Sequence, residues 1–147
     1  MSLPAPNVVL REARERAGLG LDQVAGLTGL SVEQLRDLEA GVEDVVRAVP
    51  LGPLARWCRA VGTTPRELFG GGAALLPGEG VDPFRLVDRI RDYLVYRQRT
   101  VAEFEAVVGW SVGPALAFPE DIQRWPAAAL RAVCDEVDLD WLAALPA

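Results

Sequence analysis

The side chains that most often carry out chemistry in enzymes are nearly all missing from this chain. Its 147 residues include no histidine and no lysine, and all 15 basic residues are arginine. Imidazole general bases, histidine-ligated metals and Schiff-base lysines are therefore excluded. Ser31 and Ser111 have no base to activate them, so we interpret both as helix N-caps. We expect no enzymatic activity.

Two groups of carboxylates have the residue types of a metal site. Glu12 and Glu15 lie on a helical face interleaved with arginines, and a second acidic run spans residues 135 to 140. Within that run Asp138 is better explained as a helix cap than as a metal ligand. We therefore expect no metal and no cofactor.

The composition is that of a globular protein, with 50% apolar and 24% charged residues. No apolar run approaches the roughly 20 residues needed to span a bilayer, and the first residues lack the regions of a signal peptide. Cys58 and Cys134 both fall in helical apolar patterns, which predicts buried, reduced thiols rather than a disulfide. We expect a cytoplasmic protein.

A glycine-rich segment divides the chain. Residues 70–80 concentrate glycine and have no amphipathic period, which is typical of a linker. We expect a domain on each side of it, at residues 7–69 and 81–147.

The two domains share the order of their apolar positions. An offset of 80 residues aligns Leu10 with Ile90, whereas an offset of 76 aligns Pro50 with Pro126 and Cys58 with Cys134. The first domain therefore carries four extra residues, near 42 to 48. This pattern predicts an all-α protein formed by tandem duplication of one five-helix unit.

Caps and apolar spacing place those five helices. In the first domain they cover about 8–17, a short segment ending before Gly29, 32–40, 50–61, and a short segment from Pro65. In the second domain they run from Asp82 to about Arg97, and then from Thr100, Ser111, Pro126 and the vicinity of Leu139.

The first domain resembles the Xre, or lambda-repressor-like, helix-turn-helix family over nearly its whole length. The matching residues are Leu10 to Arg14, Gly18-Leu19, Asp22 to Ala25, Gly29 to Ser31, Leu35, Leu38 to Gly41, Leu54-Ala55, Ala60 to Gly62 and Glu67 to Phe69. The resemblance implies binding to the major groove of double-stranded DNA by the helix that begins at Val32.

The outward side chains of that helix would form the DNA-reading surface, joined by basic residues nearby. The residues we assign to it are Arg11, Ser31, Val32, Glu33, Gln34, Arg36, Asp37 and Arg47. Glu33 can accept a hydrogen bond from cytosine but is repelled by phosphates. The stretch after this helix is often basic in the family, yet here it is Val-Glu-Asp-Val-Val-Arg.

The family resemblance also implies a structural ion pair. A helix-one arginine commonly pairs with the glutamate that ends the recognition helix, and the matching residues here are Arg14 and Glu39. The second domain has Leu94 and Pro119 at these positions, so both partners are missing together. Joint loss leaves no uncompensated charge.

The second domain has lost its means of reading bases. Its counterpart of the recognition helix, residues 112–119, has no side chain that can hydrogen-bond a base edge, and two prolines limit it to little more than one turn. We expect Val112, Leu116 and Phe118 to form an apolar interaction surface there.

Two functional hypotheses remain. The leading one is a DNA-binding transcriptional regulator, in which the first domain binds DNA and the second mediates homodimerisation or binds a protein partner. The alternative is an acidic protein interaction module, antitoxin-like or anti-regulator, that does not bind DNA and keeps the helix-turn-helix as a scaffold. The net charge of -6 favours the alternative, whereas the resemblance favours the first.

Overall fold

The structure is a computed structural model that describes residues 3–72, 75–76 and 78–147. Over these residues it contains helices and no β-strand, which confirms the predicted all-α class. The N-terminal half contains α1 (Pro6–Arg16), α2 (Leu21–Thr28), α3 (Val32–Glu39), α4 (Val45–Ala48), α5 (Leu51–Val61) and α6 (Pro65–Leu68). The C-terminal half contains α7 (Pro83–Arg97), α8 (Val101–Val108), α9 (Gly113–Ala117), the 3-10 helix η1 (Pro119–Arg124), α10 (Ala127–Glu136) and α11 (Trp141–Ala144).

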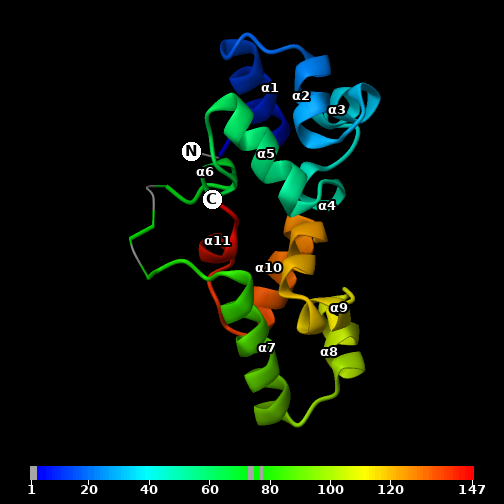
Figure 1. The fold of residues 1–147 in the computed structure, drawn as a ribbon, viewed down its shortest axis with the longest axis vertical. Coiled ribbons are helices and arrows are strands. Elements are labelled where there is room, and N and C mark those ends of the chain that lie inside the picture. Colours follow the sequence, from blue (N-terminus) through cyan, green and yellow to red (C-terminus); the bar gives the residue numbers. More distant parts are fainter. Residues whose placement is uncertain (1–2, 73–74, 77) are drawn as a thin grey trace.

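The two halves lie one above the other along the long axis of the molecule (Figure 1). They meet at its middle, where α4 packs against α10 and α5 packs against η1. The helices α6 and α11 lie near each other beside this junction (Figure 1), and the rings of Phe69 and Trp141 are 5.3 Å apart. The halves are therefore in direct contact as well as joined by the linker.

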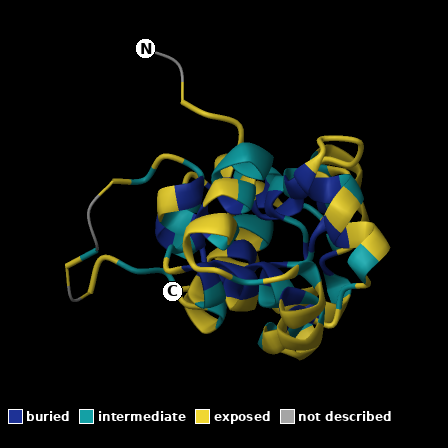
Figure 2. Cartoon of the chain, turned by 90° about the horizontal axis from the view of Figure 1, so that it is seen from above, coloured by how far each residue is buried: buried dark blue, intermediate teal, exposed yellow. Residues whose placement is uncertain are grey.

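The core of the N-terminal half is built from the apolar sides of four helices. Leu10 of α1, Val24 of α2, Leu35 of α3 and the α5 residues Leu54 and Trp57 are all completely buried. Figure 2 shows buried residues turned toward the interior and exposed ones on the outer faces of the helices. This core holds α3 in place through one side only, which leaves its other side to solvent.

The core of the C-terminal half extends across the junction. It is built around Ile90, Phe104 and Leu130, and it also includes Leu51 from α5 of the other half. Phe69 packs against the cores of both halves. Because apolar side chains of one half are buried in the core of the other, the contact between the halves resembles the apolar interior of a domain.

The structure adds two short helices that the sequence pattern did not predict. Helix α4 lies within the four extra residues near 42 to 48 and begins after Asp44, whose side chain accepts a hydrogen bond from the Val46 N–H. Helix η1 lies between α9 and α10, as α4 lies between α3 and α5. Each is too short to show a periodic apolar pattern, so local sequence analysis missed both.

Two predicted roles were wrong. The apolar spacing of residues 24–28 predicts one helix face made of Val24, Leu27 and Thr28, but Leu27 is 52% exposed, because Val24 and Thr28, four residues apart, are the pair that faces the core. Asp138 was expected to cap a helix; instead it follows α10 with a φ of 59°, and Asp140 caps α11. Within the predicted linker, residues 73, 74 and 77 lie outside the described residues.

The two cysteines are buried and unbonded, which confirms the prediction of reduced thiols. Cys58 lies on α5 and Cys134 on α10. Burial is the main reason that the pKa of each thiol is raised to about 12. A thiol with such a pKa is protonated and unreactive at neutral pH.

Candidate nucleic-acid interface

The turn between α2 and α3 sets the direction of the exposed helix. Gly29 ends α2 with a φ of 80°, a left-handed conformation that favours glycine. The buried hydroxyl of Thr28 donates to the Val24 carbonyl at 2.8 Å and accepts from the Leu30 N–H at 3.2 Å. The two hydrogen bonds of the Thr28 hydroxyl therefore hold the turn, and α3 begins at a fixed angle to α2.

Two of the residues assigned to the DNA surface cap the start of α3. The Gln34 N–H donates to the Ser31 hydroxyl at 3.0 Å, and the Ser31 N–H donates to the Gln34 Oε1 at 2.9 Å. This reciprocal pair is a capping box. Both side chains are exposed and electrically neutral, so the first turn of α3 carries no carboxylate cap.

The remaining α3 residues assigned to this surface differ in exposure. Glu33 and Arg36 are exposed, whereas Val32 and Asp37 are half-buried. They lie on the solvent side of a helix whose opposite side buries Leu35 and Leu38. Arg36 and Glu33 are therefore the charged side chains of α3 that reach furthest from the core.

Arg11 and Arg47 come from other helices. Arg11 is half-buried on α1, which packs against both α3 and α4. Arg47 is exposed on α4, and its guanidinium lies 3.8 Å from the carboxylate of Asp44. It also lines a shallow groove with Gly109 and Trp110 of the C-terminal half. The structure thus places Arg47 at the junction of the halves.

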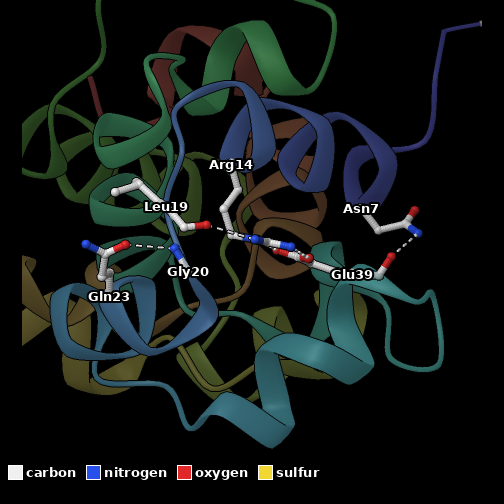
Figure 3. Close-up of polar contacts among 6 residues, drawn as sticks. All are labelled: Asn7, Arg14, Leu19, Gly20, Gln23 and Glu39. Atoms are coloured by element: carbon white, nitrogen blue, oxygen red, sulfur yellow. Dashed lines mark hydrogen bonds and ion pairs between the residues drawn. The ribbon is translucent and has the colours of Figure 1, made fainter.

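Arg14 and Glu39, expected as an ion pair, tie α1 to the end of α3 (Figure 3). The Arg14 guanidinium donates to both carboxylate oxygens, at 2.7 and 2.8 Å, and to the Leu19 carbonyl at 2.9 Å. The hydrogen bond to Glu39 is the main reason that the pKa of Arg14 is raised. Asn7 donates to the Glu39 carbonyl at 3.1 Å, so the end of α3 is fixed twice.

Two further side chains position α2, and sequence analysis assigned no role to either. The Gly20 N–H donates to Gln23 Oε1 at 2.7 Å at the start of α2 (Figure 3). Arg56 of α5 donates to the carbonyls of Leu27 and Thr28, both at 3.2 Å, at its end. The first contact has a local signal, a glutamine three residues into the helix; the second joins residues far apart in sequence.

In the C-terminal half, the starts of α8 and α9 are capped by carboxylates. At the start of α8 the Thr100 N–H donates to Glu103 at 3.1 Å. At the start of α9, Glu105 accepts from the N–H groups of Val112, at 2.7 Å, and Gly113, at 3.1 Å. The bond from Gly113 is the main cause of the lowered pKa of Glu105, and the bond from Thr100 has the same effect on Glu103. A negative charge therefore lies at each of these helix starts.

The apolar surface expected on α9 is largely absent. Val112 is completely buried in the core of the C-terminal half, and Leu116 is half-buried against it, whereas Phe118 is 64% exposed. The prediction was wrong for Val112, because this short helix turns its apolar side inward instead of presenting it. Ala115, three residues on, is buried with it, as expected for neighbours on one helix face.

Comparison with known proteins agrees with this geometry. Residues 8–69 match the family model of a helix-turn-helix domain, and the match covers α2, the turn and α3. Residues 8–69 are therefore similar to helix-turn-helix domains. Neither the curated proteins nor the solved structures contain a match to the chain. Among the described residues, no helix has the length and apolar character needed to cross a membrane.

Proposed function

We propose that this chain is a DNA-binding transcriptional regulator of the Xre type, and that α3 of its N-terminal half reads a short site in double-stranded DNA. The match of residues 8–69 to a helix-turn-helix family carries the proposal. The exposed side of α3 supports it, since a helix anchored through Leu35 and Leu38 can enter the major groove with its outer side.

Each residue of the surface has a distinct proposed role. Arg36 hydrogen-bonds a base edge, preferably guanine, and Glu33 accepts from cytosine. Ser31 and Gln34 hold the first turn of α3 and contact the sugar–phosphate backbone, with Val32 and Asp37 at the edge of the contact. Arg11 and Arg47 neutralise phosphates on either side. The N-terminal half carries 8 Arg against 9 Asp and Glu over residues 7–69, so its attraction to DNA is local rather than general.

The C-terminal half does not bind DNA in this proposal. The starts of α8 and α9 are capped by the carboxylates of Glu103 and Glu105, which accept from N–H groups there and repel phosphate. Residues 81–147 also hold 7 Arg against 11 Asp and Glu, a net charge of -4. Its role is association, with the other half or with a protein partner.

We also propose that the two halves are diverged copies of one unit, at 7–69 and 81–147, joined by the linker 70–80. The bounds of α8 lie 80 residues after those of α2, and the bounds of α11 lie 76 residues after those of α6. These are the two offsets that align the apolar positions. The shortened α9 and the absent ion pair mark the copy that has degenerated.

Selection of bound duplexes from a randomised DNA library, followed by fluorescence anisotropy on a recovered duplex, tests the function. Binding should weaken steeply with salt, by about 0.9 in log–log slope for each phosphate neutralised. Arg36→Ala should weaken binding by roughly tenfold or more. Arg97→Ala is the matched control, because it removes one exposed charge from the far end of α7 and should leave the affinity nearly unchanged.

Failure to recover any duplex would favour the alternative, an acidic protein interaction module. The net charge of -6 and the carboxylates of Glu33 and Asp37 on α3 are the observations in its favour. If Arg36→Ala and Arg97→Ala lose affinity equally, then the protein binds DNA but α3 is not part of the interface.

A further inference from the structure

Residues at equivalent positions of the two halves face each other across the junction. Pro50 and Pro126, which the offset of 76 aligns, form an isolated antiparallel bridge. Beside it the Leu51 N–H donates to the Trp125 carbonyl at 2.8 Å. When a residue pairs antiparallel with its own equivalent, the pair lies on a local two-fold axis, as at the interface of a symmetric dimer.

The helix contacts around this bridge are reciprocal. In one direction α4, which follows α3, packs against α10, and in the other η1, which follows α9, packs against α5. Since α5 and α10 are equivalent under the same offset, each half offers the same two elements to the other. This is the pattern of a self-complementary interface, in which one surface meets its own copy.

The residues that follow the two bridge prolines are buried. Leu51 is 1% exposed and belongs to the core of the C-terminal half, and its equivalent Ala127 is 0% exposed. Val46 and Phe69 of the N-terminal half also pack against that core. The apolar surface around Leu51 and Ala127 is therefore already covered within one chain.

The same arrangement puts α3 and α9 on one side of the molecule, above and below the junction (Figure 1). In a two-fold helix-turn-helix dimer the two recognition helices enter successive major grooves of a symmetric site. Here α9 has the sequence Gly-Pro-Ala-Leu-Ala, which lacks a base-reading side chain, and Glu105 occupies the N–H groups at its start. One half of such a site would thus remain unread.

We propose that the C-terminal half is an internal partner for the N-terminal half. The two halves pack about a local two-fold axis, so that the C-terminal half covers the face that a second copy of the chain would use. The chain is then a monomer that recognises a single, asymmetric DNA half-site. The DNA part of this proposal rests on the function proposed above. The internal pairing rests on the bridge, the reciprocal contacts and the duplication proposed above.

Crosslinking tests the pairing without DNA. In the full chain, Pro50→Cys combined with Pro126→Cys should form a disulfide within one chain, at a rate that does not change with protein concentration, because an antiparallel bridge brings the two positions within disulfide reach. Val95→Cys combined with Pro126→Cys is the control and should not crosslink within the chain, since Val95 lies near the far end of α7. Disulfide-linked dimers of the first variant would overturn the internal pairing.

Sedimentation of the wild-type chain, alone and with a duplex recovered from the randomised library, tests the rest. The expected results are a free protein at the monomer mass of 15.9 kDa and a complex of one chain per duplex, with a recovered sequence that has no two-fold symmetry. Free dimers, or two chains on a palindromic duplex, would overturn the proposal. If no duplex is recovered, the proposed function and the half-site fail together, whereas the crosslink still decides the internal pairing.

Discussion

Arg14 and Glu39 hold the end of α3 against α1 by two hydrogen bonds of 2.7 and 2.8 Å between guanidinium and carboxylate. The pair is largely shielded from water, with side-chain exposures of 15% and 6%. Removal of one partner strands the charge of the other, which costs about 3 kcal/mol or more in comparable buried pairs. The free energy of unfolding should therefore depend strongly on both residues.

We predict that Arg14→Leu destabilises the protein by about 3 kcal/mol, and that Arg14→Leu combined with Glu39→Leu is less destabilised than Arg14→Leu alone. Under the proposed duplication, the C-terminal half has apolar residues, Leu94 and Pro119, at both matching positions. Urea unfolding of wild type, both single variants and the double variant measures the coupling. Strictly additive losses would show that the pair acts only as two separate packing contacts.

The turn before α3 gives a prediction with an internal control. Gly29 has a φ of 80°, and no described atom lies within 4 Å of the place that a Cβ would take, so Gly29→Ala should destabilise by about 1 kcal/mol through backbone strain alone. Gly26, within α2, has equally open surroundings and no left-handed φ, so Gly26→Ala should stabilise by about 0.5–1 kcal/mol. Thermal unfolding of the two variants should move in opposite directions.

Helix α3 could be located from the sequence because its signals are local. Ser31 and Gln34 form a capping box that the spacing reveals, and Gly29 and the apolar pair Leu35 and Leu38 delimit the helix. The Arg14–Glu39 pair was accessible only through family resemblance, because the partners are 25 residues apart. Its presence in the structure agrees with that resemblance.

The features that local patterns could not give all depend on long-range packing. Glu105 caps α9 from the preceding helix, and nothing in the spacing of Glu105 and Val112 distinguishes that cap from a solvated carboxylate. Val112 was expected outside because its neighbours cannot read DNA, yet its burial depends on α7 and η1, which pack around α9. The Pro50–Pro126 bridge could be predicted only with the knowledge that the two halves are in contact.

Glu105 should make part of the stability depend on pH. Its hydrogen bonds, first that from Gly113, place its pKa in the folded protein below the unfolded value. Its contribution is therefore fully present at neutral pH and is lost as the pH falls from the ordinary glutamate range through the lowered pKa. Glu105→Gln should cost about 1 kcal/mol at neutral pH and progressively less in acid.

Glu120→Gln is the matched control for this prediction, because Glu120 is an exposed carboxylate of η1. Urea unfolding of wild type and both variants, at neutral and at acidic pH, gives the comparison. A Glu105→Gln loss that stays constant across that range would show that the carboxylate charge is not what caps α9.

The buried cysteines should resist modification in the folded protein. With thiol pKa values raised to about 12, Cys58 and Cys134 carry almost no thiolate at neutral pH and have little contact with solvent. A disulfide-exchange reagent should label neither residue in native buffer and both in denaturant. Rapid labelling of one thiol in native buffer would mean that its half of the protein opens locally.

In the proposed function DNA contacts the N-terminal half through α3 and leaves α9 untouched. A ¹⁵N-labelled sample, titrated with a duplex recovered from the randomised library and followed by heteronuclear NMR, tests this residue by residue. We expect the largest amide shifts on Ser31 to Arg36 and at the start of α2, with Val112 to Ala117 unchanged. Shifts centred on α8 and α9, with α3 unaffected, would contradict it.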